Sequence, residues 1–192
     1  MTNIIPKDGE VLFFPNFFNE AESSELFNSL LTTINWKHEP IKIFGKEVMQ
    51  PRLTAWYGDK GKEYTYSGLT MRPDYWIDPL WKIKTKIEKD VGIAFNSVLL
   101  NQYRNEHDSV GWHRDNEKEL GKNPIIGSVS FGATRKFHLK HYFDKKLKTS
   151  IDLTHGSFLL MRGETQHFWQ HSIPKISTPT GARINLTFRV LI

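Results

Sequence analysis

A series of short β-prone runs constrains the fold of this 192-residue chain more than any other feature. From about residue 97 onward, runs of β-branched, aromatic and aliphatic residues alternate with turn residues at short intervals. The runs cover residues 97–104, 126–132, 137–142, 157–162, 167–173 and 183–192. We therefore expect a mainly β architecture over about residues 96–192.

Two helices are predicted in the N-terminal part, about residues 1–95. The first follows Asn19, a good N-cap with Glu22 in the capping-box position three residues later. Its apolar stripe comprises Leu26, Phe27, Leu30, Leu31 and Ile34. The second begins at Asp78, with Pro79 in its first turn, and ends at Gly92. Helices that buttress one sheet of a mainly β protein give an α+β fold class.

Composition limits the protein to a few classes. At 192 residues the chain forms a single domain, residues 1–192, and its 39% hydrophobic content supports a folded core. No apolar run has the length of a membrane helix, and the N-terminus has no signal-peptide pattern. The sequence contains no cysteine, which excludes disulfides and thiolate zinc sites. A net charge of +5 mildly favours a polyanionic partner, although a soluble surface explains it equally well.

His113, Asp115 and His171 have the chemistry of a metal site. In extended backbone, residues i and i+2 point the same way, so His113 and Asp115 can reach one ion while Arg114 turns aside. A histidine from a distant strand then completes the two-histidine, one-carboxylate set of non-haem iron oxygenases. Taken alone, the pattern is weak, because His-x-Asp occurs by chance in many proteins.

The C-terminal run has one polar and one apolar face. Arg183, Asn185, Thr187 and Arg189 alternate with Ile184, Leu186, Phe188, Val190 and Ile192. The polar residues on an inner face would need an anionic partner, since burying an unpaired guanidinium is costly. The alternative is an edge strand with its polar face in water. Together with the metal ligands, a bound dicarboxylate is the better interpretation.

The motifs resemble those of the AlkB family, in order and at consistent spacings over about residues 40–192. They are Asn101-Gln102-Tyr103, His113-Arg114-Asp115-Asn116-Glu117, Ser128 to Arg135, His171-Ser172-Ile173-Pro174 and Arg183-x-Asn185-Leu186-Thr187-Phe188-Arg189. Upstream, Pro51-Arg52, Tyr57-Gly58-Asp59 and Tyr64 to Leu69 resemble the branch of animal AlkB homologues two and three. The resemblance implies a double-stranded β-helix, or jelly roll, with an N-terminal nucleotide-recognition lid.

The resemblance also assigns the cofactor site. His113, Asp115 and His171 would hold iron(II), and the family context of His171 selects it over His167. The co-substrate 2-oxoglutarate would be bound by Asn101, Tyr103, Arg183, Asn185, Thr187 and Arg189. Arg183 would contact its distal carboxylate, while Asn185 and the catalytic Arg189 would lie nearer the metal. Dioxygen is the second co-substrate.

By the same resemblance, the nucleic acid is recognised mainly by the first third of the chain. Tyr66 would stack on a flipped base, and Tyr64 and Glu117 would contact its edge. Phe44 would be a wedge that enters the duplex, unless it folds back onto the core at a hairpin turn. Tyr64 and Tyr66 could also be ordinary hairpin positions. Arg52 and Arg135 are expected to contact phosphates.

The implied function is repair of N-alkylated bases in DNA, of the 1-methyladenine and 3-methylcytosine type, with release of formaldehyde, succinate and CO2. The alternatives are RNA demethylation and a 2-oxoglutarate oxygenase acting on a protein or small molecule. The chain departs from the duplex-repairing homologue at Asn116 and in a short loop after residue 142, which puts duplex preference in doubt. We expect a monomer without a membrane partner, cytoplasmic in a bacterium or nuclear in a eukaryote.

Overall fold

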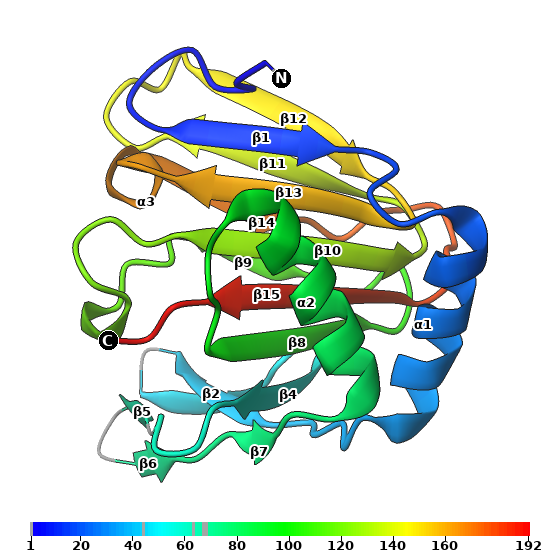
Figure 1. The fold of residues 1–192 in the computed structure, drawn as a ribbon. Helices are drawn as coiled ribbons and strands as arrows, with labels where there is room; N and C mark the ends of the chain where they lie inside the picture. The colour runs from blue at the N-terminus through cyan, green and yellow to red at the C-terminus, as the bar shows by residue number, and fades with distance from the viewer. Residues whose placement is uncertain (1, 44, 63, 67–68) are drawn as a thin grey trace.

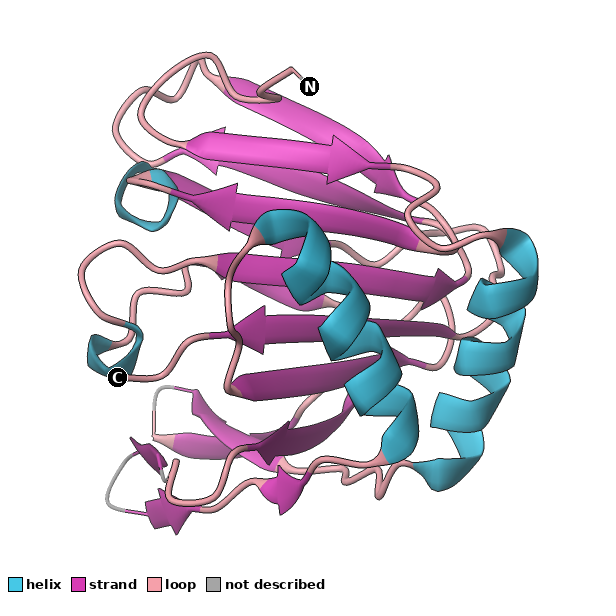
Figure 2. Cartoon of the chain, in the orientation of Figure 1, coloured by secondary structure: helices cyan, strands magenta, loops and turns pink. Residues whose placement is uncertain are grey.

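The computed structural model describes residues 2–43, 45–62, 64–66 and 69–192. Two mainly antiparallel sheets face each other, with helices on the outer face of the larger one (Figures 1 and 2). This is the jelly roll with buttressing helices that the sequence predicts. Among the described residues, no helix has both the length and the apolar character needed to span a bilayer.

The larger sheet has seven strands in the order β1-β13-β10-β15-β8-β4-β7. Their bounds are β1 Glu10–Phe14, β13 Ser157–Arg162, β10 Ile126–Gly132, β15 Arg183–Arg189, β8 Ser97–Tyr103, β4 Leu53–Gly58 and β7 Asp74–Tyr75. Only the short β4–β7 pairing is parallel among the pairs of this sheet in the described chain. Because β15 lies between β10 and β8, the alternative of a water-exposed edge strand is wrong.

The smaller sheet has four strands in the order β12-β11-β14-β9. They are β12 Lys148–Leu153, β11 Arg135–His141, β14 Trp169–Ile173 and β9 Val110–His113. Two hairpins, β2 (Pro40–Ile43) with β3 (Lys46–Met49) and β5 (Tyr64–Tyr66) with β6 (Leu69–Met71), lie beyond the β4 side of the larger sheet (Figure 1). The larger sheet therefore contains β1, β4 and the short β7 from the N-terminal part of the chain, in addition to the strands expected after residue 96.

The two predicted helices begin where the sequence indicates, and the second also ends there. Helix α1, Glu20–Thr33, has a complete capping box between Asn19 and Glu22. Helix α2, Asp78–Val91, has proline in its first turn and ends at Gly92, whose φ of 68° places it in the left-handed region. In contrast, the strand predicted from residue 167 starts at Trp169, because Thr165–Phe168 form the short helix α3. The C-terminal strand ends at Arg189, three residues before its predicted end.

Two apolar layers hold the fold together. The first lies between the helices and the larger sheet and includes Leu30 of α1, Ile83 of α2 and Leu186 of β15, all fully buried. The second lies between the sheets and includes Leu139, Leu159 and further residues of β10, β11, β13 and β14. Each such fully buried aliphatic side chain contributes about 1.5–3 kcal/mol. The two faces of β15 thus meet different surroundings, apolar toward the helices and polar toward the smaller sheet.

Gly156, which precedes β13, has a φ of 75° and no room for a side chain. A Cβ there would lie against Ser23 Oγ and 2.6 Å from the carbonyl oxygen of Phe18. We expect Gly156→Ala to lower the free energy of unfolding by about 1–3 kcal/mol more than Gly163→Ala does, through overpacking. Gly163 is a matched control, because its φ is 64° and an added Cβ would have no atom within 4 Å. Equal losses in chemical denaturation would contradict this assignment.

Candidate iron and co-substrate site

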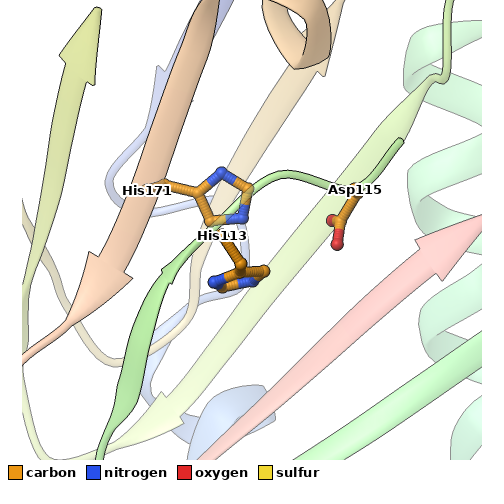
Figure 3. A group of neighbouring side chains, drawn as sticks. All are labelled: His113, Asp115 and His171. Atoms are coloured by element: carbon orange, nitrogen blue, oxygen red, sulfur yellow. The ribbon is translucent and has the colours of Figure 1, made fainter. Parts of the chain in front are cut away.

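The three predicted metal ligands converge between the sheets (Figure 3). His113 ends β9 and His171 lies in β14, and the antiparallel register places them directly opposite each other. Asp115 follows β9 by two residues, as the i, i+2 spacing requires. The ligand atoms of the three side chains lie within 4.8 Å of one another. Arg114 turns aside, donating to the His167 carbonyl and lying over the Tyr142 ring.

The electrostatics favour the ligand forms of these groups. Burial would raise the pKa of the Asp115 carboxyl, but the charge of the Arg189 guanidinium, which also donates a hydrogen bond to it, lowers this pKa overall, so the carboxylate is ionised. Burial lowers the pKa of His171 to about 3, which keeps its imidazole neutral near pH 7. Its buried Nδ1 has no hydrogen-bond partner among the described residues. Two imidazoles and an ionised carboxylate match the donor set of a non-haem iron(II) site, so these residues fit the metal.

Neighbouring groups hold the ligands in place. Arg189 Nη2 donates to Asp115 Oδ1 at 2.8 Å, and the Asp115 backbone N–H donates to Gln166 Oε1 at 2.9 Å. His113 Nδ1 lies 2.8 Å from the Gly111 carbonyl oxygen. A proton on that nitrogen is donated to the carbonyl, which leaves Nε2 for a metal. His167 lies elsewhere, with Nε2 against the Lys122 carbonyl and 3.1 Å from Asn123 Oδ1.

The polar face of β15 points toward the same interior. Asn185 donates to Ser128 Oγ at 2.8 Å, and Thr187 donates to Asn185 Oδ1 at 3.0 Å. On the other side of β15, Arg183 pairs in register with Tyr103, and Asn185 with Asn101. The predicted co-substrate residues therefore lie side by side on two neighbouring strands, β15 and β8.

Arg183 has the properties of an anion-binding residue. It is 1% exposed, and burial lowers the pKa of its guanidinium to about 10, so it remains charged. Its Nη2 donates to Ser130 Oγ at 2.9 Å, while Nε and Nη1 have no acceptor in the described part of the chain. A buried cation with two free N–H groups calls for a carboxylate. The site thus fits the distal carboxylate of 2-oxoglutarate.

A cavity of about 480 Å³ joins the metal ligands to Arg183. Its polar lining includes Asn101, Tyr103 and the inward residues of β15, and its apolar lining includes Leu120, Phe137 and Met161. The volume falls within the usual range for small-molecule sites. Two polar ends with apolar walls between them can bind a dicarboxylate across the cavity and exclude bulk water.

The predicted nucleic-acid contacts have different placements. Glu117 lines the cavity, and its buried Oε2 has no partner among the described residues, which suits a contact with a base. Arg52 also lines the cavity and donates to Asn101 Oδ1 at 2.7 Å. Arg135 is 1% exposed and donates to three backbone carbonyls, so the expected phosphate contact does not fit its position.

The remaining predictions cannot be placed. Phe44 lies outside the described residues. Tyr64 and Tyr66 form strand β5, but their side chains are also outside the description.

Sequence reasoning missed several residues of the site. Ser128 and Ser130 of β10 bind the side chains of Asn185 and Arg183, and Gln166 binds the backbone at Asp115. The serines alternate along a strand predicted from 126 to 132, so cross-strand register with the C-terminal strand is the signal that could have found them. Gln166 gave no such signal, because it lies in the short helix α3, between the strands predicted over 157–162 and 167–173.

Comparisons with known proteins agree with this geometry. A profile of the 2OG-Fe(II) oxygenase superfamily matches residues 10–189. The human alpha-ketoglutarate-dependent dioxygenase alkB homolog 3 is 41% identical over 94% of this chain and 66% of its own length. The bovine protein of that name is 42% identical over the same shares. The chain thus spans just under two thirds of the length of these relatives.

Two further similarities extend the comparison. The human DNA oxidative demethylase ALKBH2 is 38% identical over 91% of this chain and 71% of its own length. The solved structure described as that of OsALKBH1 superposes with a TM-score of 0.66, covering 93% of this chain and 97% of that chain. At 16% identity, that likeness shows the fold alone. Together with the profile match, the identity to these relatives shows that the chain belongs to the 2OG-Fe(II) oxygenase superfamily and, within it, to the AlkB family.

Proposed function

We propose that this protein is an iron(II)- and 2-oxoglutarate-dependent dioxygenase that removes alkyl groups from N-alkylated bases in DNA. The observation that supports it most is the placement of a His113–Asp115–His171 ligand set and a buried, partly unpaired Arg183 in one cavity. The printed names of the relatives, a DNA oxidative demethylase among them, support the choice of substrate class.

The chain's own residues bind and orient the reactants. When bound, iron(II) with 2-oxoglutarate and dioxygen supplies the oxidation of the N-alkyl carbon, whose hydroxylated product releases formaldehyde. Asp115 is held for the metal by Arg189 and by the Gln166 side chain. Arg183 orients the distal carboxylate of the co-substrate, and the apolar walls keep water from the reacting atoms.

The substrate base enters from the side of Glu117. Glu117 Oε2, which has no hydrogen-bond partner among the described residues, would accept a hydrogen bond from the base edge, and Tyr66 would stack on the ring. Extrusion of the base, or a single-stranded substrate, is required because the metal ligands lie between two sheets.

The direct test measures formaldehyde and succinate with iron(II), 2-oxoglutarate and an oligonucleotide that contains 1-methyladenine. We expect release with the wild type and a loss of more than about 100-fold in Asp115→Ala, because even outer-shell partners of metal ligands cost about 10–100-fold. Asp152→Ala is the control, since this carboxylate lies on the surface and pairs with Lys136. Succinate without consumption of alkylated DNA would transfer the proposal to RNA, protein or small-molecule substrates.

Replacement of Arg183 should affect the co-substrate and not the nucleic acid. We expect Arg183→Ala to raise the 2-oxoglutarate concentration for half-maximal rate by about 10–100-fold, since a hydrogen bond to a charged group contributes about 1.5–3 kcal/mol. DNA affinity, measured by fluorescence anisotropy, should change little. Arg162→Ala is the matched control, because that arginine pairs with Glu10 outside the cavity. An unchanged co-substrate requirement would place the carboxylate contact elsewhere.

The predicted wedge at Phe44 remains a prediction from the sequence. We expect Phe44→Ala to slow repair of duplex DNA several-fold more than repair of single strands, because the wedge replaces the flipped base only in a duplex. The ratio of the two initial rates is the measurement. Phe143→Ala, which removes an aromatic ring that is 67% exposed, should leave that ratio unchanged. Equal losses on both substrates would assign Phe44 to packing.

A further inference from the structure

Arg135, the first residue of β11, is buried behind the cavity and has no part in the reaction described above. It is 1% exposed and does not line the cavity itself. A buried guanidinium is costly unless its N–H groups are satisfied, so its contacts indicate what it does for the protein.

The contacts of Arg135 join three segments around one end of the cavity. Nη1 donates to the Asn105 carbonyl at 3.2 Å, and Nη2 donates to the carbonyls of Asp108 and Pro174. Asn105 and Asp108 belong to the connection from β8 to β9, and Pro174 directly follows β14. The planar fork of one side chain therefore fixes the connections that leave the co-substrate strand β8 and the ligand strand β14.

Arg135 also lies over the ring of Tyr103, which lines the cavity. The guanidinium carbon of Arg135 is 5.7 Å from the ring centroid, and that of Arg183 is 5.0 Å from it. Tyr103 is 2% exposed, lines the cavity and pairs in register with Arg183. Two buried cations thus share one aromatic ring, and the one nearer the cavity keeps two N–H groups without acceptors among the described residues.

We propose that Arg135 is a positioning residue that fixes Tyr103 and, through it, the Arg183 guanidinium, and so sets the length of dicarboxylate that the cavity accepts. The proposal rests on the proposed function, because it concerns the same co-substrate. The distance between the metal ligands and Arg183 is constant only while Tyr103 and the two connections stay in place. A side chain that satisfies three carbonyls at once is suited to that task.

Lysine cannot replace this arginine. Its single ammonium carries the charge, but it does not present a planar fork to carbonyls from separate segments. If Arg135 acted only through its charge, Arg135→Lys would behave as the wild type. If Arg135 positions Tyr103, the same variant must leave Tyr103 and Arg183 less well fixed. The cavity would then discriminate less between dicarboxylates of different length.

The test measures, by calorimetry, the equilibrium binding of dicarboxylates to the iron(II)-loaded protein. Oxygen is excluded so that no turnover occurs. The probes are 2-oxoglutarate and 2-oxoadipate, which is longer by one methylene. The measured quantity is the dissociation constant of 2-oxoadipate divided by that of 2-oxoglutarate. We expect this ratio to fall about tenfold in Arg135→Lys, an effect of the size of one hydrogen bond to a charged group. Arg162→Lys, the control outside the cavity, should keep the wild-type ratio. A general loss of folded protein would lower the active fraction without changing this ratio.

A second variant keeps the proposal testable if Arg135→Lys does not fold. Tyr103→Leu removes the shared ring and should lower the same ratio. In the double variant the decreases in the ratio should not add, because both substitutions release the same Arg183 guanidinium. An unchanged ratio in Arg135→Lys or in Tyr103→Leu would overturn the inference. Failure of the wild type to bind either acid would instead overturn the proposed function.

Discussion

Two guanidinium groups on the inner face of β15 are the constraint on which the rest of the site depends. Arg183 is fully buried and Arg189 is partly buried, and each needs a negative partner. Arg189 finds one within the chain, the carboxylate of Asp115. Arg183 keeps two N–H groups without acceptors among the described residues. At the metal end of the cavity, Arg189 is therefore paired with Asp115. At the other end, Arg183 is available for the carboxylate of a ligand.

The two sheets divide the chemistry between them. The smaller sheet supplies His113 and His171, which lie opposite each other where β9 pairs with β14. The segment that follows β9 supplies Asp115. The larger sheet supplies the residues proposed to bind the co-substrate, on the inward faces of β8 and β15. The Arg189–Asp115 ion pair joins β15 of the larger sheet to a proposed metal ligand. Helices on the outer face stiffen the larger sheet without entering the site (Figure 1).

Sequence could predict what depends on local pattern or on a motif. The N-cap of α1 follows from the Asn19 and Glu22 capping box, and the polar face of β15 from its two-residue alternation. His113 and Asp115 follow from their i, i+2 spacing, whereas His171 needed the family motif. What depends on tertiary packing could not be predicted. Arg135 resembles a surface cation in sequence, yet its fork is enclosed by connections far away in the chain. Gln166 lies in α3, a helical turn that the sequence did not predict and that Thr165 anchors by hydrogen bonds with Glu10 and Arg162.

The most direct test of the account is anomalous scattering at the iron edge from crystals grown without oxygen in the presence of iron(II) and 2-oxoglutarate. The account predicts one strong peak among His113, Asp115 and His171, with continuous density for the dicarboxylate from that peak to Arg183. A peak at other residues, or a dicarboxylate bound away from Arg183, would contradict it.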